Sequence, residues 1–589
     1  MMPAEDGQGA RPRGHGASAR GAPARGELPP YSYEPLKHRW ELKLNFMSGV
    51  TLGPWLSFLW THWRDIDWGL FWHRVAFLTC MSVVNTLLSA FDWLLHSRAV
   101  AAQPLHPEPL FILGHPRSGT THLHNLLSRD PAFAFANTFH AGFPSSFLAL
   151  EPARGLLAGL LAPTRPMDRM ALSWELPAED EIAVNVLSGC RVSPYAALVL
   201  PRAWRAAGVA AGGAPGGGEA VEGGSRGAAG GGGGGAGAAG SSGRAGGGVV
   251  GLRDFLDWEW EWEEEVESEE GAAAEHQAQG EEEKQQQEQA TRREAQRQRQ
   301  RPLPAQQRSG GAAAAAGQDA GGGAGTGTGM GAEGHPVAAA AAAAAAAPSR
   351  QSPHQRRRAA LRAAAFEEWL ASFMWFMKKI TYRHVRLQQQ RTAAATAAAA
   401  AATAPGCSGA QPPPPAAAAQ PPQPPMLLIK SPVHTARLGT WLRLFPRARF
   451  VYVHRHPLEV FQSAAHMANT YYPYTYLQAP DDATTNDFIM DQYELMYSSY
   501  ASRRAAVPPG RLVELGFGEL EADPLAALGR VYEAFGWSDR WPAVAPLFGD
   551  YSASLADFKK NQFTSTVYVA AGHTARLLAT HVPNPPTAG

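Results

Sequence analysis

The stretch Pro109-Leu110-Phe111-Ile112-Leu113-Gly114-His115-Pro116-Arg117-Ser118-Gly119-Thr120-Thr121 decides the fold of this 589-residue chain. Residues 109–113 are apolar and β-prone, as expected of a central strand in a parallel sheet. A glycine loop follows, and the apolar spacing of residues 122–127 then opens a helix. Such a loop gathers backbone N–H groups at the positive end of a helix dipole, and Thr120 and Thr121 add hydroxyls. The stretch therefore predicts an anion-binding loop in an α/β fold.

This loop has the glycine spacing of a Walker loop without its lysine. Thr120 and Thr121 stand where a nucleoside triphosphatase has Lys followed by Ser or Thr, and the fixed cation is Arg117, before the second glycine. A triphosphatase needs that lysine on the β- and γ-phosphates and a hydroxyl on Mg²⁺. The departure argues against a P-loop-type nucleotide kinase, an alternative that calorimetry with ATP and Mg²⁺ would test.

A second pattern predicts another phosphate site. Residues 450–454 form a β-prone run, Arg455-His456-Pro457 ends it, and a helix begins before Ser463. Arginine offers a planar fork that fits a phosphate, and a serine one to two turns into the helix can reach the same anion. We expect the two patterns to meet in the folded chain and to bind one anionic ligand.

Together these patterns resemble the motifs of sulfotransferases. Pro116-Arg117-Ser118-Gly119-Thr120-Thr121 is similar to their 5′-phosphosulfate-binding loop, and Arg455 with Ser463 to their 3′-phosphate site, although His456 stands where the family usually has Asp or Asn. Residues 426–434 resemble the family's strand and Lys-Ser/Thr loop, and residues 558–563 its terminal Lys-Asn-x-Phe segment. The likeness is strongest to the large branch with Gly-His-Pro-Arg-Ser-Gly-Thr-Thr and Lys-Ser-Pro motifs.

The resemblance implies an α/β protein with a central parallel sheet flanked by helices, a P-loop-like sulfotransferase fold with long disordered inserts. It implies transfer of a sulfuryl group from 3′-phosphoadenosine-5′-phosphosulfate, the co-substrate, to a hydroxyl or amine by in-line displacement. The residues implied to bind this nucleotide are Arg117, Ser118, Gly119, Thr120, Thr121, Arg455, Ser463, Lys559 and Lys560.

The acceptor needs a general base, and two regions compete for the role. Repulsion and burial could raise the pKa of one carboxyl in the trio Glu179, Asp180 and Glu181, which would equally suit a charged helix N-terminus. His434 lies two residues beyond the place where cytosolic sulfotransferases often have a catalytic histidine, and it could instead cap or pack. We favour Glu181 or Glu179 over His434. Lys430 and Arg117 are expected to stabilise charge on the transferred group. We expect no metal, because the sequence has no metal-ligand cluster.

Composition indicates one folded domain interrupted by low-complexity sequence. The chain has 61 Gly, 47 Pro and three Cys, and its formal net charge of zero suggests no nucleic-acid partner. Its expected parts are a disordered tail (1–28), a Trp-rich helical region (29–106), the first half of the core (107–205), a disordered insert (206–357), a core helix (358–387), an Ala/Pro linker (388–425), the second half of the core (426–575) and a tail (576–589).

A membrane association through residues 46–95 stays open at this point. Residues 75–91 carry no charge, but as a helix they span about 25 Å, less than a bilayer core of about 30 Å. They suit a helix packed on a core or lying in an interface, whereas the nearby tryptophans are typical of an aromatic belt. The location therefore stays open between a Golgi-like endomembrane and the cytoplasm. So does the acceptor, whether carbohydrate, lipid or small molecule, and a non-catalytic membrane scaffold with a sulfotransferase-like core is a second alternative.

Overall fold

The computed structural model describes residues 32–190, 193–211, 353–402 and 424–561. Its internal contacts divide the chain into two units, one made of Met1–Asp257 with Arg362–Gly589 and the other of Trp258–Leu361. Of the second unit, the structure describes only residues 353–361. The expectations for both tails, for most of the insert at 206–357 and for residues 403–423 lie outside the described residues.

Five parallel strands form one sheet, in the order β2-β3-β1-β4-β5. Their bounds are β1 (Leu110–Leu113), β2 (Phe133–Phe135), β3 (Met426–Lys430), β4 (Arg449–His454) and β5 (Leu512–Gly516). β1 is buried along its whole length, because it lies between β3 and β4 and its faces are both covered. The prediction of a parallel α/β sheet built around residues 110–113 is confirmed.

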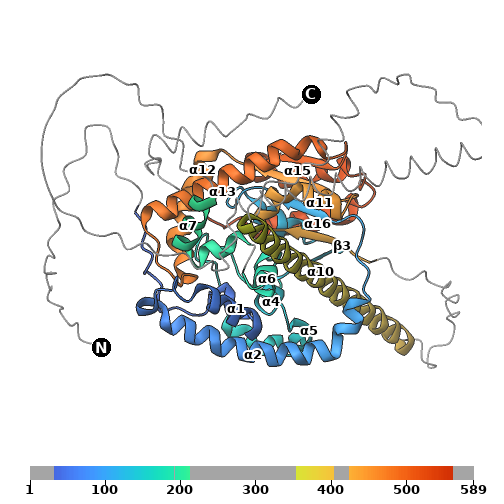
Figure 1. The fold of residues 1–589 in the computed structure, drawn as a ribbon. Coiled ribbons are helices and arrows are strands. Elements are labelled where there is room, and N and C mark those ends of the chain that lie inside the picture. The colour runs from blue at the N-terminus through green and yellow to red at the C-terminus, as the bar shows by residue number, and fades with distance from the viewer. Residues whose placement is uncertain (1–31, 191–192, 212–352, 403–423, 562–589) are drawn as a thin grey trace, which may run out of the picture. The chain divides into compact units, whose positions relative to one another are not determined.

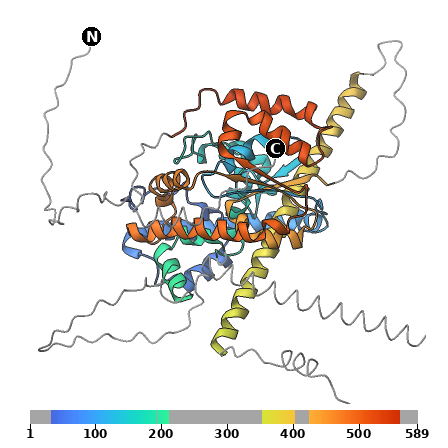
Figure 2. The same ribbon diagram turned by 90° about the horizontal axis from the view of Figure 1, so that it is seen from above.

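Helices cover both faces of this sheet. Leu110 and Ile112 belong to an apolar cluster with α3 (Thr120–Leu127), α15 (Pro524–Ala534) and α16 (Trp541–Ser554). On the opposite face, Phe111 stacks on Trp441 of α11 (Leu438–Leu444), and Tyr452 stacks on Tyr500 of α13 (Asp482–Arg503). Figure 2 shows α15 and α16 (red) on one side of the strands and α13 (orange) on the other. The alternation of residues 110, 111 and 112 between faces is the ordinary period of a strand.

The long helix α10 (Pro353–Ala402) supplies a core residue from the far side of the insert. Its Trp369 is fully buried, with ring centroids 5.9 Å from Trp441 of α11. The helix predicted at 358–387 is present and longer at both ends, and the linker predicted at 388–425 is wrong for residues 388–402, which continue this helix. That extension is rich in alanine, the residue with the highest intrinsic helix propensity.

The Trp-rich N-terminal region folds against the same core. It contains η1 (Phe46–Gly49), α1 (Leu52–His62) and α2 (Trp68–Ala101), and Figure 1 shows α1 and α2 lying together along one side of the unit, beside α5 (Phe147–Leu150). Among the described residues, α2 is the one helix long and apolar enough to cross a membrane, with a mean hydropathy of 1.5 over an 18-residue window that is 28% buried.

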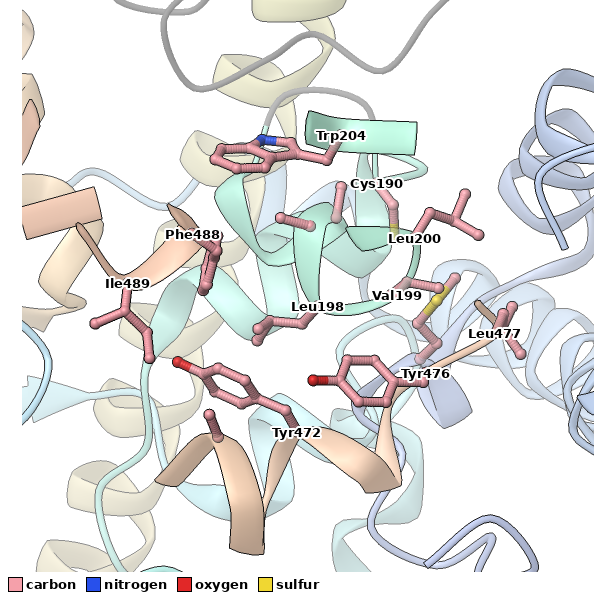
Figure 3. Packing of buried hydrophobic residues seen from close by; sticks show 14 of the residues in the cluster. Cys190, Leu198, Val199, Leu200, Trp204, Tyr472, Tyr476, Leu477, Phe488 and Ile489 are labelled. Atoms are coloured by element: carbon pink, nitrogen blue, oxygen red, sulfur yellow. The ribbon is translucent and has the colours of Figure 1, made fainter. Parts of the chain in front are cut away.

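A second apolar cluster joins these N-terminal helices to the later part of the chain. Trp55, Phe71 and Leu78 belong to it, together with α12 (Pro457–Thr470), α7 (Pro201–Ala211) and η3 (Pro194–Leu198). Figure 3 shows its centre, where Trp204 lies near Phe488 with ring centroids 5.3 Å apart. The remaining described elements are α4 (Thr138–Gly142), η2 (Glu151–Leu160), α6 (Asp180–Leu187), η4 (Pro432–Arg437), η5 (Tyr472–Tyr474), η6 (Arg504–Ala506) and α14 (Phe517–Ala522).

Candidate functional site

The loop between β1 and α3 has a backbone that requires its glycines. Gly114 and Gly119 have φ values of +138° and +103°. A Cβ on Gly114 would lie 2.5 Å from Val453 O, and one on Gly119 would clash with the ring of Phe517. Arg117 also adopts a positive φ, +78°. The loop therefore holds a conformation that L-residues rarely adopt, which is common where backbone N–H groups must converge on a ligand.

The N-terminus of α3 presents unsatisfied donors. No acceptor for the backbone N–H of Gly119, Thr120 or Thr121 lies within the described part of the chain. The Ser118 hydroxyl, by contrast, is buried and donates to His115 O at 2.8 Å, so it holds the loop together. Three consecutive N–H groups at the positive end of a helix are suited to an anion.

The two sequence motifs meet at the carboxyl ends of adjacent strands. Arg117 Nε donates to Ser463 Oγ at 2.9 Å, although the residues are 346 positions apart. Arg455 Nη1 donates to Arg117 O at 3.3 Å, and its guanidinium lies 4.4 Å from the centroid of the Phe517 ring. Asp168 accepts from Arg117 Nη1 at 3.0 Å. The structure thus brings Gly119, Arg117, Arg455 and Ser463 around one point.

The acidic trio is paired, in order, with three basic residues at the end of β3 and in η4. Lys430 Nζ lies 2.6 Å from Glu179 Oε1, His434 Nε2 lies 2.6 Å from Asp180 Oδ2, and Arg437 Nη1 lies 2.8 Å from Glu181 Oε2. Lys430 is the last residue of β3, and His434 and Arg437 lie one turn apart in the 3-10 segment η4 that follows. The trio therefore holds the start of α6 against η4.

Two of the three candidate bases lie inside this contact. The Glu181 carboxylate is fully buried, binds Arg437 with both oxygens and accepts from Trp369 Nε1 at 3.2 Å. His434 is fully buried and lies edge-on to Trp441 and Phe373. Neither side chain lines the cavity described next, so both are placed as structural residues.

Glu179 differs, because it stands just before α6 and its side chain faces a cavity. Burial would raise the pKa of Glu179, but Lys430 and the hydroxyl of Tyr195 outweigh burial and bring that pKa below its ordinary value. Burial lowers the pKa of Lys430, against the effect of Glu179. The pKa of Tyr195 is raised well above its ordinary value by burial and by Glu179, so the phenol stays protonated and donates to the carboxylate.

The cavity has a volume of about 780 Å³. Lys430 Nζ lies at the wall of this cavity, 3.3 Å from Thr121 Oγ1. This contact connects the ion pair of Glu179 and Lys430 to the loop between β1 and α3. Most of the other wall is apolar. Lining residues from the site and the loop are Arg117, Thr120, Thr121, His124, Arg165, Glu179, Tyr195 and Lys430, and apolar ones include Phe46, Phe77, Met81, Phe143, Leu160, Met167, Trp174 and Ile182.

The predicted C-terminal lysines lie at the edge of the described structure. Lys559 and Lys560 are exposed, and Lys560 Nζ pairs with Glu521 at 2.6 Å. Asn561 Nδ2 donates to Met167 O at 2.8 Å, which brings this segment to the wall of the cavity. Within the described ranges, no group of three His, Cys, Asp or Glu side chains is arranged to hold a metal ion.

Sequence reasoning missed three residues of the site. Tyr195 binds Glu179, Asp168 holds Arg117, and His124 lines the cavity with an Nε2 atom that has no partner among the described residues. Burial lowers the pKa of His124 well below its ordinary value, so the imidazole is neutral. One signal was present in the sequence for His124, which follows the loop threonines by one turn of the helix.

Comparison with known proteins places this chain in a described family. The model of the Sulfotransferase family matches residues 109–171 and 261–542, more than half of the chain. The omega-hydroxy-beta-dihydromenaquinone-9 sulfotransferases Stf3 of Mycobacterium bovis and Mycobacterium tuberculosis are each 31% identical over 141 residues, 24% of this chain. The match spans about a third of their length, 36%.

Two solved structures share a broad likeness. Sulfotransferase STF1 from Mycobacterium tuberculosis aligns with a TM-score of 0.40 and 13% identity, over 83% of this chain and 84% of its own. Sulfotransferase STF9 from Mycobacterium avium aligns with a TM-score of 0.39 and 12% identity, over 90% of this chain and 95% of its own.

Proposed function

Because this chain belongs to the sulfotransferase family, we propose that it transfers a sulfuryl group from 3′-phosphoadenosine-5′-phosphosulfate to a hydroxyl or amine of its acceptor. One observation carries the proposal. Two anion-binding motifs, separated by 346 positions in sequence, meet at the ends of neighbouring strands, so that a nucleotide with a phosphate at each end could contact both.

Residues present at the site fit the two ends of this nucleotide. The N–H groups of Gly119, Thr120 and Thr121 are free to bind its 5′ end, with Thr121 Oγ1 and Lys430 close by. Arg455 and Ser463 would bind its 3′-phosphate, and Lys559 and Lys560 would add charge as the C-terminal segment approaches. When bound, the nucleotide supplies the sulfuryl group and a phosphate leaving group.

Glu179 is our choice for the general base. Of the three candidates it alone lines the cavity, and its depressed pKa keeps it ionised at neutral pH. Lys430, held by Glu179 and near Thr121, is placed to stabilise negative charge that develops on the transferred group. Tyr195 orients the carboxylate. The base Glu179 and the cation Lys430 thus belong to one ion pair.

A hydroxyl is the acceptor group we favour. The named mycobacterial relatives are sulfotransferases of omega-hydroxy-beta-dihydromenaquinone-9, so the matched segment occurs in proteins whose acceptor carries a hydroxyl. Glu179 could take a proton from such a group at the cavity wall.

The test is sulfate transfer by the full-length protein from labelled 3′-phosphoadenosine-5′-phosphosulfate to a panel of alcohols, phenols, sugars and amines. Transfer that is lost in Arg117→Ala and Arg455→Ala but kept in Arg530→Ala, a change in an exposed ion pair with Glu519, supports the proposal. Calorimetry with ATP and Mg²⁺ serves as the second arm. A protein that binds ATP with Mg²⁺ but does not bind the bisphosphorylated nucleotide would favour a kinase. A protein that binds neither ligand would favour a scaffold.

A further inference from the structure

The inner side of helix α2 buries several polar residues. Arg74, Ser82, Asn85 and Asp92 are all buried, at 0–2% exposure, although the helix is otherwise apolar. A helix on the surface of a water-soluble protein has the opposite arrangement, with its polar residues outside. From residue 79 to residue 99 the buried residues of α2 are all polar, so this part of the helix reverses that arrangement, whereas its first turns also bury Phe71, Val75 and Leu78.

Each of these buried polar groups is held by the folded core. Arg74 donates to the carbonyls of Pro473, Tyr476 and His38 over 2.5–2.9 Å. Asn85 Nδ2 donates to Ser48 O and Val50 O, at 2.7 and 3.0 Å. Asp92 forms an ion pair of 2.8 Å with Lys379 of α10. Since these anchors run along the length of α2, the helix lies on the protein and does not leave it to span a bilayer.

The outer side of α2 exposes large apolar side chains in a helical stripe. Leu94 is 74% exposed and Leu87 is 69% exposed, and no charged residue lies between Arg74 and Asp92. Trp60, in the neighbouring α1, is 90% exposed. The outer face, defined here by its exposed members, consists of Trp60, Trp63, Trp72, Val83, Val84, Leu87, Phe91, Trp93, Leu94 and Leu95.

The flank of α2 next to this outer face forms part of the cavity wall. Phe77 and Met81, one turn apart, line the cavity, and Trp40, which also lines it, packs on His73 with ring centroids 4.4 Å apart. Trp40 is itself 62% exposed. An apolar surface therefore continues from the outer face of α2, past residues 73–81, into the cavity that holds Glu179.

We propose that the outer face of α1 and α2 lies on a lipid bilayer and that the cavity takes its acceptor, a long-chain lipid alcohol, from that bilayer. The inference rests on the proposed function, and it names the class of acceptor for the same site. A bilayer is the occupant we infer because tryptophans gather at the α1 end of the outer face, as at membrane interfaces, and because the face continues into the substrate cavity. A mainly apolar cavity of this size suits a hydrocarbon chain better than a sugar.

The first experiment measures flotation of the full-length protein with phosphatidylcholine vesicles on a density gradient. We compare wild type with Leu87→Gln/Leu94→Gln and with the matched control Leu525→Gln/Leu547→Gln, two exposed leucines outside the outer face. The outer-face variant should lower the ratio of bound to free protein on the order of tenfold or more, since each change removes burial of a leucine side chain. The control should float like wild type.

The second experiment measures sulfate transfer to hexadecanol in the same vesicles and to a short, water-soluble alcohol. The outer-face variant should lose most transfer to vesicle hexadecanol and keep transfer to the soluble alcohol. Met81→Trp, which fills the cavity, should lower transfer to hexadecanol and leave flotation unchanged. Circular dichroism and thermal melting establish that each variant is folded.

The outcomes separate this inference from the proposed function. A wild type that transfers sulfate to soluble acceptors but neither floats nor uses hexadecanol overturns the inference and leaves the function standing. A wild type that transfers sulfate to nothing defeats the proposed function. Light scattering could show that the outer-face variant is a monomer where wild type is a dimer, without any change in flotation. The outer face would then bind a second copy of this chain, and the inference would fail.

Discussion

Arg117 Nε lies 2.9 Å from Ser463 Oγ, so the cation of the first anion-binding motif is bonded to the hydroxyl of the second. The same arginine is held by Asp168, and its carbonyl accepts from Arg455. Arg117 is thus a junction between the motifs. It fixes the spacing of the two motifs, so the proposed nucleotide would meet a preformed site, which reduces the ordering cost of binding.

Arg455→Ala should weaken binding of adenosine 3′,5′-bisphosphate by about 10- to 150-fold, as expected for loss of a hydrogen bond to a charged group worth about 1.5–3 kcal/mol. Ser463→Ala should also weaken it, because the change leaves Arg117 Nε without this acceptor. Calorimetry at fixed salt measures both. Arg530→Ala removes the same charge at an exposed site and should bind like wild type. Equal losses in Arg455→Ala and Arg530→Ala would point to a general charge effect and against a 3′-phosphate site.

Glu179→Gln should lower kcat by about 100- to 10,000-fold, the usual contribution of a general base. The pKa of Glu179 lies below its ordinary 4.5, because Lys430 and Tyr195 outweigh burial, and the base works when ionised. In wild type, kcat/KM should therefore rise with pH through a limb below pH 4.5. It should fall again where Lys430 loses its proton, below pH 10.5, since burial lowers the pKa of that residue.

A depressed carboxyl pKa also stabilises the fold, and this stability is present above the ordinary pKa and lost as pH falls through the folded one. Circular dichroism must therefore accompany the acid limb of the pH profile. Glu175→Gln, at an exposed carboxylate that pairs with Arg154, is the matched control and should keep the wild-type profile. An acid limb that persists in Glu179→Gln would assign the base elsewhere, and His124 would be the next residue to replace.

Glu181→Ala should destabilise the protein by about 3–5 kcal/mol, because it leaves Arg437 as a buried charge without its carboxylate. Chemical denaturation measures the loss. The double variant Glu181→Leu/Arg437→Met should recover most of it, since a buried ion pair is often replaced by apolar residues at little cost. If Glu181→Ala instead keeps wild-type stability and loses turnover, Glu181 acts in catalysis as the sequence suggested.

Gly119→Ala should abolish measurable nucleotide binding, because the added Cβ meets the Phe517 ring and the backbone φ is +103°. Gly518→Ala, at the residue that follows Phe517 in the sequence, is the control for this change. It lies inside α14, where a Cβ meets nothing, and should raise stability by about 0.5–1 kcal/mol through helix propensity. Calorimetry and thermal melting measure the two effects. Normal binding by Gly119→Ala would mean that this loop does not approach the nucleotide.

The sequence predicted the elements that are apolar and buried. β1, β3 and β4, and the helices after them, lie where residues 110–113, 426–429 and 450–454 indicated, because a central parallel strand must be apolar on both faces. β2 and β5 were not predicted. They lie at the two edges of the sheet, one with only three residues and the other mostly half-buried, so neither carries a strong apolar run.

The sequence predicted that the two motifs meet, but not how the acidic and basic residues beside them pair with one another. The convergence of Arg117 with Arg455 follows from two strand-loop-helix patterns, because parallel strands end at one edge of a sheet. The roles within Glu179, Asp180 and Glu181 depend on partners about 250 positions later. The spacing of His434 and Arg437 was a usable signal, since three positions set both bases on one side of the 3-10 segment η4, just after Lys430 at the end of β3.

The central strand β1 comes from the first half of the chain, whereas both of its neighbours, β3 and β4, come from the second. During synthesis, β1 and β2 therefore leave the ribosome before any strand that they will pair with. The apolar strand β1 stays unpaired at both of its edges until β3 and β4 have been made. Chaperones recognise such segments. If the gene were divided between these halves, the two polypeptides would have to interleave strand between strands, and neither product could complete the sheet alone.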